Sequence, residues 1–248
     1  MKTLLCVDTA SFALHFALYE DLDEDLHDAD SKRLLFQHQT AVAQQWTHSA
    51  LLVPLLEKAI QESETDVQDL SAICVNVGPG SFTGLRASLS MVRALGQFLP
   101  NLKIVPVTGF QMHLARLLNE TPNILDCQAI AIALDARRQQ QYMAYFTQNN
   151  SGKWTTQAQG LFSDEAVFAQ LTDHTLYYAD TACLSRYAGD SPTHLLEAQN
   201  AKMTDALWRA VILFDIEAVA WHALDALYLQ EPHITPNPNP PKAFHFTV

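Results

Sequence analysis

The sequence of 248 residues is short of basic side chains and of long apolar runs. It has 15 Lys and Arg against 27 Asp and Glu, and its net charge of −12 argues against direct nucleic-acid binding, because contacts with phosphates need clustered cations. No apolar run approaches the roughly 20 residues of a membrane-spanning helix. The N-terminus lacks the basic region, apolar stretch and cleavage site of a secretion signal. We therefore expect a cytoplasmic protein with no membrane contact.

Residues suited to metal binding or nucleophilic catalysis are also scarce. Cys6, Cys74, Cys127 and Cys183 include no C-x-x-C pair, which is typical of core residues in a reducing compartment. No two of the ten histidines lie closer than ten residues, so a metal site would need ligands from distant segments. No Ser, Cys or Lys stands in a recognisable nucleophile motif. The sequence therefore predicts no metal and no catalytic residue.

Two segments have a biased composition. Glu20–Asp30 carries seven carboxylates in eleven residues but lacks the glycine and terminal glutamate of a calcium loop. It is interpreted as a solvated loop or as a contact for a basic partner. Residues 232–248 hold five of the eleven prolines and are expected to extend without a core of their own.

One pattern occurs in both halves of the chain. An apolar strand ending in aspartate, a turn and a returning strand appear at Thr3–Asp8 with Ala13–Tyr19, and again at Ala129–Asp135 with Gln141–Thr147. This predicts an internally duplicated α/β fold in which Asp8 and Asp135 correspond. We expect subdomains at residues 1–108 and 109–231 and a tail at 232–248, with the last helix a candidate to pack back on the first subdomain. The other expected strands are Leu34–Thr40, Ala72–Val77, Ile104–Val107 and Leu176–Ala179, and the expected helices are Ser49–Gln61, Gly84–Leu99, Phe110–Leu118 and Ile212–Leu229.

The stretch VGPGSFTGLR, Val77–Arg86, holds three of the eight glycines. It does not fit the dinucleotide fingerprint, the P-loop or the nucleophile elbow, because Thr83 stands where glycine is needed and no lysine is present. Instead it predicts a strand joined to a helix by a tight loop, with Ser81 or Thr83 as N-cap. The free N–H groups at the start of that helix are suited to binding an anion. The alternative is a structural connection that binds no ligand. The candidate phosphate or nucleotide residues are Asp8, Gly78, Gly80, Ser81, Thr83, Gly84 and Arg86.

Two expected helices, Ser49–Gln61 and Gly84–Leu99, carry apolar residues on several sides. Such helices form either a core layer of this chain or a docking surface for a partner's helices. The candidate partner-binding residues are His48, Leu51, Leu52, Leu55, Leu56, Leu85, Arg86, Leu89, Val92 and Arg93.

Taken together, these motifs resemble the TsaB (YeaZ) family. The stretches that carry the resemblance follow in the family's order over most of the chain: LLCVDTASFALHFAL, HSALLVPLLEKAI, GPGSFTGLR, VPVTGF, DARRQQQYMAYF and LYLQEP. The resemblance implies the duplicated fold of actin, Hsp70 and the acetate and sugar kinases. It also implies a non-catalytic subunit of the bacterial machinery that makes threonylcarbamoyladenosine in tRNA. Such a subunit pairs with the catalytic subunit TsaD through the two broad helices and works with the ATPase TsaE, so it meets tRNA only through the complex. No cofactor of its own is implied, and a nucleotide at the subunit junction stays open.

The sequence departs from the family pattern in its second half. Gln139 and Gln140 stand where many members carry Gly-Glu, and Ala226–Gln230 replaces a Pro-x-Tyr-Leu-Arg pattern. The sequence disfavours two other functions. A small-molecule phosphotransferase is disfavoured because the turn Asp8–Ser11 lacks the glycine that approaches phosphate. A peptidase is disfavoured by the absent histidine pair and serine elbow. A homodimer through the two broad helices is the alternative when the partner is absent.

Overall fold

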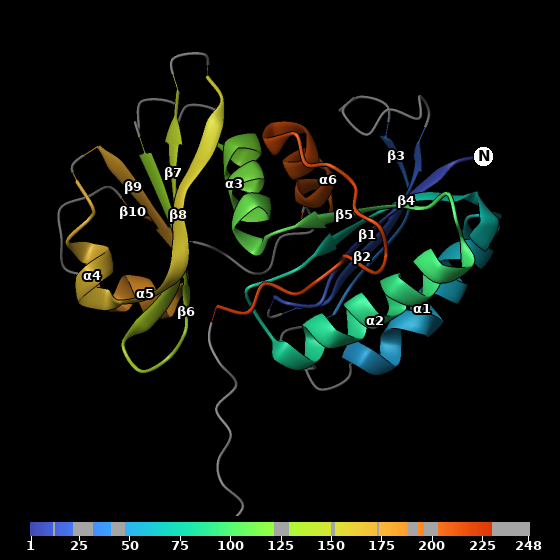
Figure 1. Cartoon of the computed structure of the whole chain (residues 1–248), viewed down its shortest axis with the longest axis horizontal. Helices are drawn as coiled ribbons and strands as arrows, with labels where there is room; N and C mark the ends of the chain where they lie inside the picture. Colours follow the sequence, from blue (N-terminus) through green and yellow to red (C-terminus); the bar gives the residue numbers. More distant parts are fainter. Residues whose placement is uncertain are drawn as a thin grey trace, which may run out of the picture.

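The structure is a computed structural model that describes residues 1–11, 13–21, 32–40, 48–121, 129–149, 152–172, 174–187, 193–195 and 203–229. These residues form two five-stranded sheets with helices around and between them (Figure 1). The acidic run from residue 22 onward, Cys127 and the proline-rich tail lie outside the described residues. The elements of the first sheet and its helices are β1 (Thr3–Asp8), β2 (His15–Asp21), β3 (Lys32–Gln39), α1 (His48–Glu62), the short helix η2 (Val67–Asp69), β4 (Leu70–Asn76), α2 (Phe82–Phe98) and β5 (Lys103–Val107). The later elements are α3 (Gly109–Glu120), β6 (Ala129–Asp135), β7 (Gln140–Gln148), β8 (Trp154–Ser163), α4 (Asp164–Phe168), β9 (Thr175–Ala179), α5 (Thr181–Arg186), β10 (Thr193–Leu195) and α6 (Met203–Phe214).

The two sheets have the same topology. The first runs in the order β3-β2-β1-β4-β5, and the second runs β8-β7-β6-β9-β10 when read from the corresponding edge. In each sheet the first three strands pair antiparallel as a meander, and the fourth and fifth strands continue parallel to the first. The predicted duplication is therefore confirmed. Asp8 and Asp135 each end the first strand of their sheet.

Both faces of the first sheet are buried, which explains why β1 is a continuous apolar run. Leu5 and Val7 face the layer of α1 and α2, whereas Leu4 and Cys6 face α6. In the second sheet α3 covers one face, and α4 with α5 covers the other. Helices α3 and α6 pack on each other between the two sheets (Figure 1). One packed layer of two helices thus joins the halves.

Most expected elements lie within two residues of those observed, and of the two expected N-cap candidates, Ser81 and Thr83, Ser81 is the N-cap of α2. The three described cysteines are free and buried, as expected for core residues. Sequence reasoning missed the second-half elements β8, α4, α5 and β10. Within the described parts of the chain, no helix is both long and apolar enough to cross a membrane.

The predicted helix Ile212–Leu229 is wrong. Helix α6 covers Met203–Phe214 and ends at Asp215, whose φ of 54° is left-handed, and the N–H of Ile216 returns to the carbonyl of Val211 at 3.0 Å. Residues 215–229, here named the strap, then run without a helix across the first half. The N–H of Val219 donates to the carbonyl of Ile104 at 2.7 Å, on the outer edge of β5. Pairing with a distant strand outcompetes the helical spacing of the strap's apolar residues.

Candidate functional site

The glycine stretch lies directly against the first turn of the chain. A Cβ on Gly80 would stand 2.2 Å from the carbonyl oxygen of Ala10, and one on Gly84 would stand 1.9 Å from that of Thr9. The N–H of Ser81 donates to the Ala10 carbonyl at 2.9 Å, and the Thr9 hydroxyl donates to the Gly84 carbonyl at 2.7 Å. These glycines are therefore required for the close approach of two backbone segments.

Asp8 links the turn to the strand beneath the glycine stretch. Its Oδ1 accepts hydrogen bonds from the N–H groups of Ala10 (2.9 Å) and Ser11 (3.2 Å) and from the Asn76 amide (2.9 Å), while its Oδ2 accepts the Ser11 hydroxyl at 2.5 Å. The side-chain oxygen of Asn76, Oδ1, in turn accepts the N–H of Gly78 at 2.8 Å. A fully buried carboxylate with these partners holds the turn in place. The geometry therefore favours a structural role for Asp8.

Gly78 meets a third segment. Its φ is +109°, which favours glycine, and an added Cβ would stand 2.9 Å from the carbonyl oxygen of Leu227 in the strap. The N–H of Leu227 donates to the Val77 carbonyl at 2.7 Å. The loop is thus enclosed between the first turn and the strap.

The N-terminus of α2 is the exposed part of this loop. The Ser81 hydroxyl accepts the N–H of Gly84 at 3.2 Å, and Ser81, Thr83 and Arg86 are all exposed. The Arg86 guanidinium lies over the Phe82 ring, 5.3 Å from its centroid. The predicted phosphate residues thus separate into two groups. Asp8, Gly78, Gly80 and Gly84 hold the loop together, whereas Ser81, Thr83 and Arg86 gather at an exposed helix end that suits an anion. Anion binding stays a prediction.

Most of the predicted partner-binding side chains lie in the chain's own core. The buried ones are Leu52, Leu55, Leu56, Leu85, Leu89 and Val92. Leu51 is half-buried, the side chain of His48 lies outside the described residues, and Arg86 is exposed. Arg93 is also exposed, but it donates to the carbonyl of Leu224 and lies 3.7 Å from Asp225. Both helices are thus a core layer, and a partner would contact their outer side.

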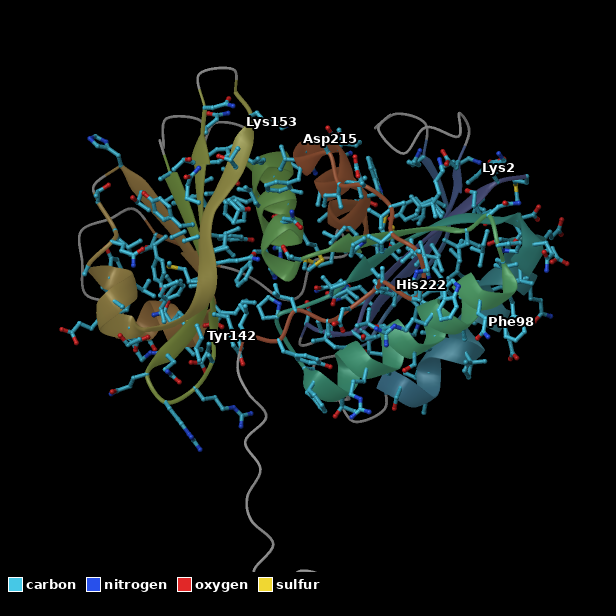
Figure 2. All side chains as sticks on the ribbon, in the orientation of Figure 1. Lys2, Phe98, Tyr142, Lys153, Asp215 and His222 are labelled. Atoms are coloured by element: carbon cyan, nitrogen blue, oxygen red, sulfur yellow. The ribbon has the colours of Figure 1, made fainter. Side chains whose placement is uncertain are left out.

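That outer side carries exposed apolar side chains. Val53 on α1 is 56% exposed. Phe98, at the C-terminal end of α2, is 79% exposed (Figure 2). The strap adds Trp221 and Tyr228, and the Tyr228 ring lies 5.3 Å from that of Phe82. Sequence reasoning missed these two aromatic residues because it placed them on a helix. We name Val53, Phe82, Arg86, Phe98, Trp221 and Tyr228 the outer helix surface.

The corresponding turn of the second half is built differently. Asp135 lies 3.0 Å from Arg186, and its N–H donates to Asp180 at 2.6 Å. The turn itself has three successive residues with left-handed backbone, Arg137, Arg138 and Gln139, at φ of 66°, 53° and 58°. No glycine relieves this conformation. Arg186 also pairs with Asp164 at 2.7 Å, so an ion-pair network takes the place of the close backbone contacts seen in the first half.

A buried histidine lies in the layer between the halves. His113 on α3 is 4% exposed, and its ring stacks edge-on against Tyr178 with 6.3 Å between centroids. Burial lowers the pKa of His113 to about 3. The positive charge of nearby Arg116 and, to a smaller extent, His15 lower this pKa further. His113 is therefore neutral at physiological pH. Among the residues with described positions, no three His, Cys, Asp or Glu side chains are grouped to hold a metal ion.

Two curated proteins of the same pathway are similar to this chain in sequence. The TsaB protein of tRNA threonylcarbamoyladenosine biosynthesis from Escherichia coli K12 is 26% identical over 153 residues, which is 61% of this chain and 58% of that protein. The TsaB protein of Haemophilus influenzae is 25% identical over 142 residues, 57% of this chain and 52% of that one. The chain is therefore similar to TsaB proteins over more than half of its length.

A solved structure and a family model show two further similarities. YeaZ from Pseudomonas aeruginosa has the same fold, with a TM-score of 0.69 and 20% identity over 92% of this TsaB-like chain and all of that chain. The family model for TsaD, tRNA N6-adenosine threonylcarbamoyltransferase, matches residues 41–160. The TsaB-like chain spans about half the length of the curated relatives it matches, 49% in the case of TsaB from Buchnera aphidicola of Schizaphis graminum.

Proposed function

We propose that this chain is the non-catalytic subunit of a bacterial complex that makes N6-threonylcarbamoyladenosine in tRNA. The observation that carries the proposal is its similarity to curated TsaB proteins of that pathway. In this proposal the chain works in the cytoplasm, pairs with a TsaD-like catalytic subunit, cooperates with a TsaE-like ATPase and meets tRNA only through the complex. Its charge of −12 fits a subunit that leaves tRNA binding to its partners.

The TsaD match suggests how the two subunits meet. It covers residues 41–160 and so includes α1 and α2. A TsaD-like partner is then expected to carry a similar helix pair, and two similar helix pairs can pack across an approximate two-fold axis. On this chain the outer helix surface is available for the contact, because Val53 and Phe98 are exposed there. Below them the buried leucines of both helices hold the surface rigid.

Binding to the cognate TsaD-like subunit tests the proposal. We expect Val53→Asp and Phe98→Asp each to weaken the complex at least about tenfold, because a carboxylate replaces an apolar contact. Gln170→Asp is the matched control, because Gln170 is exposed on the second half and gains the same charge. Calorimetry with the purified subunits measures the affinity, and mass spectrometry of tRNA from cells depleted of the native subunit measures the modification. Failure of the unmodified chain to bind the TsaD-like subunit would overturn the proposal.

The N-terminal end of α2, which carries Phe82 and Arg86 of this surface, is proposed as the place for a nucleotide phosphate at the subunit junction. Ser81, Thr83 and Arg86 are exposed there, next to Phe82 of the outer helix surface. Arg86→Ala separates the two roles. If the arginine holds phosphate, nucleotide binding by the assembled complex falls at least about fivefold while subunit affinity is retained. Loss of subunit affinity alone would assign Arg86 to the protein contact instead.

A further inference from the structure

The outer strands of the two sheets differ in how they are protected from pairing with another chain. An exposed edge strand offers unpaired N–H and C=O groups, and proteins usually block it with charge, proline, short length or a covering segment. Strand β5 contains Pro106 and is bridged by Val219 of the strap. Strand β10 has only three residues. Strand β3 begins with Lys32 and Arg33. These three edges each carry a protective feature.

Strand β8 carries the fewest of these features. Its ten residues, WTTQAQGLFS, include no proline and no charged side chain. Within the described residues, the backbone ladder of β8 joins β7 alone, and no turn or loop hydrogen bond involves the backbone of residues 154–162. In Figure 1 β8 lies in front of the other strands of its sheet, and no labelled helix or strand crosses it. One long edge of the second sheet is therefore open to another strand.

We propose that this β8 edge is a self-association interface, at which two copies of the chain pair antiparallel about a two-fold axis and join their second sheets into one. A free strand edge is complementary to another strand edge, since each supplies the donors and acceptors that the other needs. In a two-fold pair the same segment contributes both strands, so charges of one sign within it would be brought close to their counterparts in the other copy. The segment Trp154–Ser163 has none, and a second copy meets no such repulsion there.

Other features of the chain limit the strength of this pairing. The register of β7 and β8 shifts between Tyr145 and Phe146, which leaves Gln157 unmatched as a bulge that twists the edge. Each copy also carries a net charge of −12, so two copies repel each other. The dimer is therefore weak and concentration-dependent. It tightens with added salt because salt screens the repulsion.

The β8 edge is separate from the outer helix surface. Helices α1 and α2 lie beside the first sheet at the other side of the molecule from β8 (Figure 1). Pairing through β8 therefore leaves the helix pair free for a different subunit. This interface differs from a homodimer through α1 and α2, and substitutions can tell the two apart.

Sedimentation velocity of the full-length chain over a range of concentrations tests this interface. We expect Gln159→Lys, on the exposed side of β8, to weaken self-association at least about tenfold, since the pair would then bring two lysines close together in one joined sheet. Gln97→Lys places the same charge on α2 and is expected to have no effect. Amide hydrogen exchange gives a second measurement, with protection of β8 rising as the protein concentration rises.

Three results would overturn the proposal. These are a chain that stays monomeric at millimolar concentration in 0.5 M salt, a dimer weakened by Gln97→Lys and not by Gln159→Lys, and a dimer that neither substitution affects. Thermal unfolding of both variants checks that each remains folded. Binding to a TsaD-like subunit is measured separately, so failure of self-association leaves the proposed function standing.

Discussion

The turns after Asp8 and Asp135 occupy the same place in two sheets of the same topology, yet different interactions hold them. The first turn lies against a glycine-rich loop. Because Gly80 and Gly84 have no Cβ, the two backbone segments can approach more closely than any other residue type would permit. The second turn has side chains at every left-handed position and is tied by the ion pairs of Arg186. A duplicated fold thus preserves the path of the chain while the two copies are stabilised differently.

This difference has a functional counterpart. The first turn supports the start of α2, one of the two helices of the outer helix surface, so its close backbone packing fixes that helix in position. The second turn joins β6 and β7 at an exposed tip. The close backbone contacts of the first turn therefore support the helix at which we propose that a partner docks.

The largest expected effect comes from filling the space at the first turn. Gly84→Ala would place a Cβ 1.9 Å from the Thr9 carbonyl oxygen, so the backbone must move, and we expect a loss of at least about 3 kcal/mol in the free energy of unfolding. Urea unfolding measures it. Gly109→Ala is the control, because its Cβ would meet nothing closer than 3.5 Å, and a change below about 1 kcal/mol is expected. Equal losses would refute the close-approach argument.

Removing each aspartate compares the two turns directly. Asp8→Ala leaves the buried amide groups of Asn76 and Ala10 without an acceptor, and we expect a loss of about 3 kcal/mol. Asp135→Ala removes an ion pair whose side chains are 23% and 26% exposed, and Arg186 keeps Asp164, so a loss of about 1 kcal/mol is expected. Chemical denaturation of both variants under one set of conditions compares their losses in the free energy of unfolding. A larger loss for Asp135→Ala would reverse the comparison.

Much of this arrangement could be predicted from sequence because it is local. The strand ending in aspartate appears twice, and both turns were located from it. The helix pattern beyond the glycines also limits the N-cap to Ser81 or Thr83, and the structure has Ser81. The strap could not be found, since the bridge from Val219 to Ile104 joins residues far apart in the sequence. Nor could apolar spacing on α1 and α2 show that Leu52 and Leu89 are buried by their own sheet, because a core and a docking surface need the same side chains.

The stability of the protein is expected to depend on pH through His113, which lies in the layer between the two halves. Because the pKa of His113 is lowered in the folded state, the unfolded chain binds the proton more tightly, and stability falls as pH drops below about 6.5. Between pH 6.5 and 5 the loss from this group is about 2 kcal/mol. His113→Gln is expected to remove that part of the slope, while His222→Gln, at an exposed position, is expected to keep it. Urea titrations at several pH values measure the slopes, and identical slopes for the parent and His113→Gln would contradict this account.

The smallest effect concerns the strained second turn and has the opposite sign. Gln139 has a φ of 58°, which costs a residue with a Cβ about 1 kcal/mol relative to glycine, so Gln139→Gly is expected to stabilise the protein by up to about 1 kcal/mol. Its backbone carbonyl still accepts the N–H of Asp164. Gln140→Gly is the matched control, because Gln140 begins β7 in an extended conformation and glycine weakens a strand by roughly 0.5–1 kcal/mol. Thermal unfolding of the pair measures both signs. If both substitutions destabilise the chain, the left-handed turn is not strained, and the contrast between the two turns reduces to the ion pairs of Arg186.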